Sequence, residues 1–163
     1  MENQDKISRY LKILNFTDCL LVSKPSPELI TIYANLVVFI KYNFKEISWV
    51  GFYLINKNYN GLILGPYNGP LACNYIGFNN GVCGKCATSK ETQIILDVNK
   101  IQYHIACDSL SKSEIVLPLI INNELLSVLD IDSHQLATFD EVDKKYLEEI
   151  LEKIRLYIEK NKV

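Results

Sequence analysis

The segment 113–133, SEIVLPLIINNELLSVLDIDS, decides the fold of this chain. Its two halves, 113–121 and 124–131, are rich in β-branched and other apolar residues, which is typical of strands. Asn122-Asn123 stands between them, and asparagine tolerates the positive backbone angles of a tight hairpin turn. The segment therefore predicts two antiparallel strands that are neighbours in one sheet.

Further strands are expected earlier in the chain. Ile47–Ile55 is rich in β-branched and aromatic residues, and a turn at 58–61 leads it back into 62–64 as a second hairpin. Another strand is expected at 93–96. Residues 65–80, GPYNGPLACNYIGFNN, read as a long loop with one extended piece, and such a loop in a compact domain usually has a function.

Helical patterns occur on both sides of the strands. Segments 2–14 and 27–44 are expected to be helices, the second with Ser26 as N-cap ahead of Pro27. A short helix is expected at 81–90.

The C-terminal segment has the clearest helical pattern. Thr138 with Glu141 predicts a capping box at its start. Apolar residues then continue as a helical stripe, at Phe139, Val142, Tyr146, Ile150, Ile154 and Ile158.

The order of these elements predicts an α+β fold. Helices come first, strands follow and a helix comes last, so we expect a central antiparallel sheet with the N- and C-terminal helices packed together on one face. The chain has no repeat, low-complexity tract or linker-like composition, so residues 1–163 are expected to form a single domain.

Composition excludes several classes of protein. The 163 residues are 48% hydrophobic and 22% charged, which is globular composition, and the net charge of -2 argues against nucleic acid as a partner. No apolar run is long enough to span a bilayer, and the first residues, MENQDKISRYLK, lack the pattern of a signal peptide. We therefore expect a cytoplasmic protein with no membrane partner.

Five cysteines are the first candidates for chemistry: Cys19, Cys73, Cys83, Cys86 and Cys107. An odd number in a reducing compartment argues against a structural disulfide framework and leaves metal binding, redox catalysis or packing. Cys83 falls at the expected start of a helix, where the helix dipole favours a thiolate. Cys19 fits the role of a small buried apolar residue.

A structural zinc site is an alternative use of these thiols. Cys83-x-x-Cys86 and His104-x-x-Cys107 have the spacing of paired zinc ligands. However, GVCGKC reads as a helix start, a strand separates the two pairs, and so apolar a chain needs no metal to fold. We therefore expect no metal.

Three acids are expected to share one face of the sheet. Asp130 and Asp132 lie two apart on one strand, and Glu114 opens the strand that pairs with it. If the register brings them together, crowding makes at least one carboxyl keep its proton at neutral pH. The alternative is a solvated strand end with its charges in water.

Two aromatic residues also share a face. Trp49 and Tyr53 lie four apart on the Ile47–Ile55 strand, so both project to the same side. They form part of the core or the wall of a small-molecule pocket.

The motifs together resemble the free methionine-(R)-sulfoxide reductases, a family of single GAF-type domains. The matching segments are WVGFYL (49–54), LGPYNGPLAC (64–73), GVCG (81–84), HIACDSLSKSEIVLPL (104–119), LDIDS (129–133) and FDEVD (139–143). The resemblance implies a GAF-like sheet of about six antiparallel strands and a homodimer.

The resemblance also implies roles for individual residues. Cys107 is similar to the catalytic cysteine, Cys83 to the resolving cysteine that forms a disulfide with it, and Cys73 to a third cysteine on a loop that closes over the substrate and joins alternative disulfides. The acids Glu114, Asp130 and Asp132 resemble the groups that bind and protonate the substrate. Trp49 and Tyr53 resemble the aromatic wall of its pocket.

These roles predict an oxidoreductase that reduces free L-methionine-(R)-sulfoxide to L-methionine. The expected path runs through a Cys107 sulfenic acid and a Cys83–Cys107 disulfide that thioredoxin reopens, with no metal or organic cofactor. Cys86 and Cys19 depart from the family pattern. The alternative function is a GAF-type sensor module that binds a small molecule without turnover.

Overall fold

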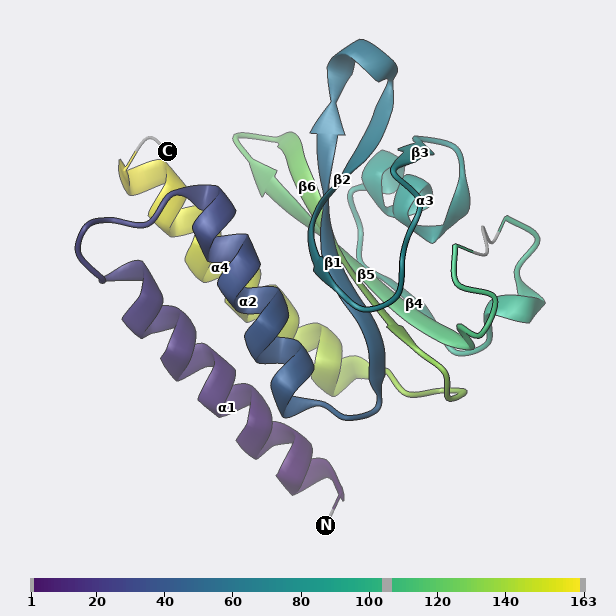
Figure 1. Ribbon diagram of the computed structural model, residues 1–163, viewed down its shortest axis with the longest axis horizontal. Helices are drawn as coiled ribbons and strands as arrows, with labels where there is room; N and C mark the ends of the chain where they lie inside the picture. Colours follow the sequence, from purple (N-terminus) through teal and green to yellow (C-terminus); the bar gives the residue numbers. More distant parts are fainter. Residues whose placement is uncertain (1, 104–106, 162–163) are drawn as a thin grey trace.

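The structure is a computed structural model that describes residues 2–103 and 107–161 (Figure 1). Its helices and strands, in chain order, are α1 (Glu2–Leu21), α2 (Leu29–Asn43), β1 (Ile47–Asn56), β2 (Gly61–Asn68), β3 (Tyr75–Gly77), α3 (Gly81–Ser89), β4 (Gln93–Ile95), β5 (Ser113–Ile121), β6 (Glu124–Ser133) and α4 (Glu141–Asn161). Short 3-10 helices, η1 (Lys57–Tyr59) and η2 (Val98–Lys100), follow β1 and β4. The strands form one six-stranded sheet in the order β3-β2-β1-β6-β5-β4, and each neighbouring pair is antiparallel.

The β5–β6 hairpin lies inside this sheet, as the sequence predicts. Asn122 and Asn123 make the turn with φ angles of 50° and 65°, the left-handed conformation that asparagine adopts more readily than most residues. β6 runs two residues beyond the predicted end, to Ser133, and pairs with both β5 and β1. The hairpin is therefore enclosed between other strands on both sides.

Side chains alternate between the two faces of the central strands. On one face, Ile115, Leu117, Leu129 and Ile131 pack with residues of α1, α2 and α4 in the larger core. On the other face, Val116 and its neighbours pack with α3 in a second, smaller core. Figure 1 shows α1, α2 and α4 together on one side of the sheet and α3 on the opposite side. The prediction of an α+β fold with the terminal helices on one face is therefore confirmed.

Element ends differ from the predictions in ways that packing explains. α1 continues to Leu21 instead of ending at residue 14, because Phe16 and Leu20 also pack against the helical core. The N-cap of α2 is Glu28, not Ser26, and it caps without a side-chain hydrogen bond. Among the described residues, no helix is both long enough and apolar enough to cross a membrane.

The expected long loop is partly a strand. β2 runs on to Asn68, and Tyr75–Gly77 forms β3, which pairs with β2 at the edge of the sheet. The irregular parts are therefore two shorter connections, residues 69–74, which carry Cys73, and residues 78–80.

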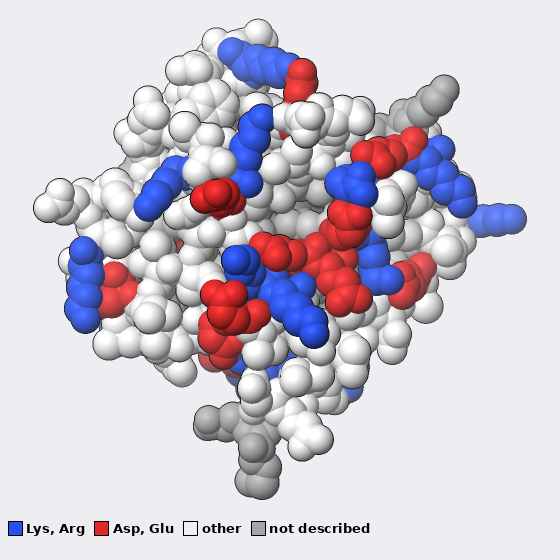
Figure 2. Space-filling view, turned by 180° about the vertical axis from the view of Figure 1, so that it is seen from behind, with Lys and Arg blue, Asp and Glu red and all other residues white. Residues whose placement is uncertain are grey.

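The side of the molecule in Figure 2 carries both signs of charge intermingled. On α4, Arg155 pairs with Glu152 and Glu159 within the helix, while Lys153 reaches Asp18 on α1 at 2.8 Å. Exposed pairs of this kind contribute little to stability individually, and they largely neutralise one another.

The start of α4 is capped by residues other than those predicted. Asp140 accepts hydrogen bonds from the backbone N–H groups of Val142 and Asp143, and the Asp143 side chain accepts one from the N–H of Asp140 at 2.8 Å. This is a capping box shifted from the predicted Thr138–Glu141 pair. Thr138 instead donates to Ser133 and Gln135.

Asp143 also fastens α1 to α4. The Tyr10 hydroxyl donates to its Oδ1 at 2.7 Å, and the Lys6 ammonium donates to its Oδ2 at 2.6 Å. Replacing Asp143 by alanine leaves both donors without this acceptor, so we expect a loss of about 2 to 3 kcal/mol in the free energy of unfolding, measured by urea denaturation at neutral pH. Glu141→Ala, in the same turn but exposed, should change it by less than about 0.5 kcal/mol. Equal stabilities of the two variants would contradict this role.

Candidate active site

The register of three central strands brings the predicted acids together. Glu114 of β5 lies opposite Asp132 of β6, and Asp132 lies opposite Trp49 of β1. Asp130 lies between Val116 and Gly51. These acids occupy the face turned away from α1, α2 and α4, and Glu114 and Asp130 are each only 6% exposed. The alternative of a solvated strand end is therefore wrong.

Burial makes this cluster hold protons. Burial, together with the nearby Asp130 charge, raises the pKa of Glu114 well above its usual value, and the same two causes raise the pKa of Asp132. Burial also raises the pKa of Asp130, but hydrogen bonds from Cys83 and Glu114 limit the rise, to about 6. At neutral pH, Asp130 is thus the most acidic member, and Glu114 keeps a proton that it can donate.

One oxygen of the cluster is open. Within the described residues, Asp130 Oδ1 is buried and has no hydrogen-bond partner. A buried acceptor without a partner is unfavourable, and this one belongs to a residue that lines a pocket. It is therefore a ready acceptor for a donor group that a ligand brings.

The aromatic pair covers the same face. The Trp49 ring stacks against Tyr67 and Tyr53, with ring centroids 5.5 and 5.9 Å apart. A Cβ at Gly51 would lie 2.4 Å from the indole, and one at Gly69, where φ is +148°, would lie 2.5 Å from it. Two glycines thus make room for the tryptophan, which is both buried and part of the pocket wall.

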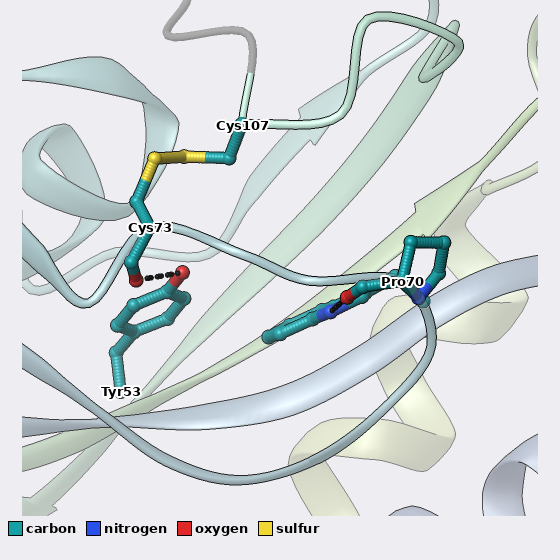
Figure 3. Close-up of a disulfide and its surroundings, with 5 residues drawn as sticks. Tyr53, Pro70, Cys73 and Cys107 are labelled. Carbon is teal, nitrogen blue, oxygen red and sulfur yellow. Dashed lines mark hydrogen bonds between the residues drawn. A yellow bond between two sulfur atoms is a disulfide. The ribbon is translucent and has the colours of Figure 1, made fainter.

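Both aromatic residues also hold the backbone of the 69–74 connection. The Trp49 indole N–H donates to the Pro70 carbonyl at 3.1 Å, and the Tyr53 hydroxyl donates to the Cys73 carbonyl at 3.0 Å (Figure 3). Burial raises the pKa of Tyr53, aided by the charge of Asp130, so this hydroxyl remains a donor at neutral pH. The wall of the pocket therefore sets the position of Cys73.

Cys73 is bonded to Cys107. Their sulfurs are 1.98 Å apart and their Cα atoms 5.5 Å apart, and Figure 3 shows the bond joining two separate segments. The pairing of Cys83 with Cys107, implied by the family resemblance, is therefore not the one in the structure. Cys83 is a free, buried thiol.

The protonation state of Cys83 also differs from the prediction. Burial raises the pKa of this thiol well above its usual value, and the charges of Asp130 and Glu114 raise it further. These effects outweigh the helix dipole, which favours a thiolate by at most about 2 kcal/mol. The prediction of a thiolate at the start of α3 is wrong, and Cys83 instead donates a hydrogen bond to Asp130.

One pocket collects most of the predicted site. Of the residues that the sequence singles out, it is lined by Trp49, Tyr53, Cys83, Cys107, Glu114, Asp130 and Asp132. Cys73 joins through its disulfide. Sequence reasoning missed Asp108 and Ser111, which also line the pocket, and the Ser111 hydroxyl donates to Asp132 at 2.7 Å. Their position in the sequence could have indicated them, because the short segment between Cys107 and Glu114 joins two residues of the same pocket.

The zinc site that the sequence offered as an alternative is not formed by the described residues. Cys107 is in the disulfide, Cys86 directs its thiol to the Val116 carbonyl at 3.6 Å, and His104 lies outside the described residues. Cys83, Glu114 and Asp130 offer ligand atoms within 4.8 Å of one another, which is the only such group in the described ranges 2–103 and 107–161. We assign no metal to it.

The two remaining thiols lie apart from this chemistry. Cys86 is buried beneath β5, and burial raises its pKa. Cys19 is exposed on α1, so the prediction that it is buried is wrong. Cys19 lies on the outer side of a helix whose other face packs on the core.

The sequence is similar to that of a known reductase. Over 118 residues, 72% of this chain and 70% of the relative, it is 40% identical to the free methionine-R-sulfoxide reductase of Escherichia coli (strain K12). No family model matches the chain.

Solved structures share the fold. The free methionine-R-sulfoxide reductase of Neisseria meningitidis, solved in complex with its substrate, superposes with a TM-score of 0.86 at 38% identity, over 92% of this chain and 88% of that one. A structure described as a GAF domain superposes with a TM-score of 0.87 at 40% identity, over 93% of this chain and 88% of that one.

The cysteine environments predict a stepwise thiol count. With the Cys73–Cys107 bond intact, one thiol per native chain should react rapidly with Ellman's reagent, because only Cys19 is exposed. Unfolding in guanidinium chloride should raise the count to three, and prior reduction should raise it to five. Cys19→Ser should abolish the rapid reaction of the native protein. A second rapid thiol in the native protein would show that Cys83 or Cys86 is accessible.

Proposed function

This chain belongs to the free methionine-R-sulfoxide reductase family, and on that premise we propose that it reduces free L-methionine-(R)-sulfoxide to L-methionine. The observation that carries the proposal is the Cys73–Cys107 disulfide beside a pocket lined by protonated carboxyls. Such a bond is the product expected after one thiol has taken the sulfoxide oxygen and a second thiol has resolved it.

Cys107 is the nucleophile of the proposed reaction. Its thiolate attacks the sulfoxide sulfur, and a carboxyl group gives a proton to the sulfoxide oxygen. The attack forms a bond between the Cys107 sulfur and the substrate sulfur. The S–O bond of the substrate then breaks as the oxygen passes to the Cys107 sulfur, the bond between the two sulfurs breaks, and Cys107 is left as a sulfenic acid. Methionine leaves with its sulfur reduced by two electrons, which the thiolate supplies.

Glu114 is the proposed proton donor. Its raised pKa keeps it protonated at neutral pH. It hydrogen-bonds to Asp130, which has the lower pKa, so Asp130 carries the negative charge while Glu114 keeps its proton. A proton donor of this kind accelerates proton-dependent reactions by about 10²- to 10⁴-fold. Asp132, which accepts a hydrogen bond from Ser111, is a second carboxyl with a raised pKa in the same pocket.

Cys73 is the proposed resolving thiol. It attacks the sulfur of the Cys107 sulfenic acid, so that a disulfide forms and water leaves. Thiol–disulfide exchange with an external dithiol then restores both thiols. Cys83 takes no part in this cycle as a sulfur nucleophile, because its pKa is raised and it donates to Asp130.

Binding of the free amino acid follows from the same pocket. The open Asp130 Oδ1 accepts a hydrogen bond from the ammonium group of the substrate, which a residue inside a protein lacks. Trp49 and Tyr53 provide apolar surface for the methyl and methylene groups. These contacts support a preference for free methionine sulfoxide over the peptide-bound form.

We propose four further properties from the sequence and the family. Thioredoxin is the dithiol reductant, no further cofactor takes part, the protein is a homodimer, and it is located in the cytoplasm. The disulfide supports the first two, because thiol exchange accounts for the electrons of the whole cycle.

The direct test is turnover of free L-methionine-(R)-sulfoxide, run beside the S epimer and a peptide-bound R sulfoxide, with thioredoxin or dithiothreitol. Cys107→Ser should form no methionine. Reduced Cys73→Ser should form about one equivalent and then stop cycling with thioredoxin. Cys83→Ser should keep thioredoxin-dependent turnover within about threefold, like the surface control Cys19→Ser.

The opposite result is equally clear. Folded, reduced wild-type protein that leaves every sulfoxide unchanged would reject the reductase and favour the sensor module. Loss of the disulfide cycle in Cys83→Ser but not in Cys73→Ser would reject the assignment of the resolving thiol.

The pKa of Asp130 predicts how substrate binding depends on pH. This carboxyl is ionised above its pKa of about 6 and protonated below it. Its attraction for the substrate ammonium is therefore present at neutral pH and lost as the pH falls through about 6. In dithiothreitol-driven turnover, KM for the sulfoxide should therefore rise as the pH is lowered through about 6. Asp130→Asn should have a high KM at every pH, and a wild-type KM that is flat between pH 5 and 7.5, about the range expected for this titration, would contradict the role.

A further inference from the structure

A short segment, residues 108–112, leads from Cys107 back to β5, and two side-chain contacts join it to β6 and to the residue that follows β6. One is the contact of Ser111 with Asp132 inside the pocket. The other joins Asp108 to His134, whose Nε2 lies 2.7 Å from Asp108 Oδ2. His134 is not among the residues that line the pocket.

Asp108 is held in one conformation by several contacts. Its Oδ1 accepts from the N–H of Leu110 at 2.9 Å, and its backbone carbonyl accepts from the N–H of Ser111 at 3.2 Å. Although burial favours the protonated form, hydrogen bonds from His134 and Leu110 lower the pKa of Asp108. Asp108 is therefore a carboxylate at neutral pH, and the His134 ring nitrogen donates to it.

His134 in turn stands on a fixed part of the sheet. It directly follows Ser133, the last residue of β6, whose hydroxyl donates to the Glu46 carbonyl at 2.7 Å. The Ser133 carbonyl accepts from the N–H of Lys112 at 2.8 Å, and its hydroxyl accepts from the N–H of Gln135 at 3.1 Å. Hydrogen bonds of Ser133, at the end of the strand that carries Asp130 and Asp132, thus fix the backbone next to His134.

We infer that His134 is a positioning residue for Cys107. Through Asp108, the neighbour of the nucleophile in the chain, it fixes the Cys107 segment relative to the end of β6 that carries Asp132. This rests on the proposed reduction, in which the Cys107 sulfur must meet the sulfoxide sulfur while the acids reach its oxygen. Small errors in such a near-attack geometry cost large factors in rate.

The exposure of the pair indicates that the role is in rate, not in stability. The side chain of His134 is 42% exposed and that of Asp108 17% exposed. Partly exposed polar contacts of this kind contribute little to folding, so replacement of His134 should leave the protein folded. An effect on the reaction then reports on the position of Cys107.

Two amide variants isolate the contact. His134→Gln places an amide nitrogen near the position of Nε2 and can still donate to Asp108, whereas the shorter His134→Asn cannot. Methionine formation is measured in single turnovers of reduced enzyme at free R sulfoxide concentrations that rise to saturation, so that the maximal rate and KM are both obtained. His134→Asn should be about tenfold slower with KM within about twofold, and His134→Gln should stay within about threefold of wild type. His134→Ser, whose side chain is also too short to reach Asp108, repeats the test if His134→Asn fails to fold.

A second readout needs no substrate. If His134 holds Cys107 near Cys73, its loss lowers the effective concentration of one thiol for the other. The Cys73–Cys107 bond, equilibrated against glutathione, should then shift about threefold toward the thiols in His134→Asn but not in His134→Gln. Lys153→Ala, which breaks an ion pair between α4 and α1, is the control and should match wild type in both assays.

Two outcomes overturn the inference. His134→Asn could equal wild type in rate and in the glutathione equilibrium, or His134→Gln could lose as much as His134→Asn. A wild-type protein that reduces no sulfoxide would reject the proposed function instead, while the glutathione equilibrium would still decide whether His134 positions Cys107.

Discussion

The pairing register of β6 with its neighbours β5 and β1 is the constraint on which the rest of the structure depends. Because strand side chains alternate, a slip of one residue would exchange the two faces of β6. Leu129 and Ile131 would leave the helical core, and the carboxyls of Asp130 and Asp132 would enter it. The apolar residues under α1, α2 and α4 thus fix the register, and through it they place the acids on the opposite face. Packing on one side of the sheet therefore positions the chemistry on the other side.

The acids are tolerated on that face because the cluster holds protons in place of charges. Ionised carboxyls this close and this deeply buried would repel one another and lose their hydration. The raised pKa values of Glu114 and Asp132 reduce the number of charges, and the thiol of Cys83 supplies Asp130 with a further donor. A buried cysteine that is no nucleophile thereby has a physical role, as a hydrogen-bond donor to the carboxyl that ionises first.

The sequence carried enough information for the fold and for most of the site. Period-two alternation predicts that Asp130 and Asp132 share a face, and the Asn122-Asn123 turn predicts the hairpin that brings Glu114 to them. The partner of Cys107 could not be predicted in this way, because it depends on the path of residues 69–74, which contacts with Trp49 and Tyr53 determine. The contact of His134 with Asp108 joins two irregular segments, and such segments have no periodic pattern from which to predict it.

The crowding around Trp49 has an optical consequence. This is the one tryptophan of the chain, and its indole lies in the pocket wall, hydrogen-bonded to the Pro70 carbonyl and stacked against two tyrosines. Fluorescence excited selectively in tryptophan therefore arises at this position alone, with no background from the helical side of the sheet. Any rearrangement of the connection that carries Cys73 alters the surroundings of that single emitter, so the protein contains its own spectroscopic label for the state of its disulfide.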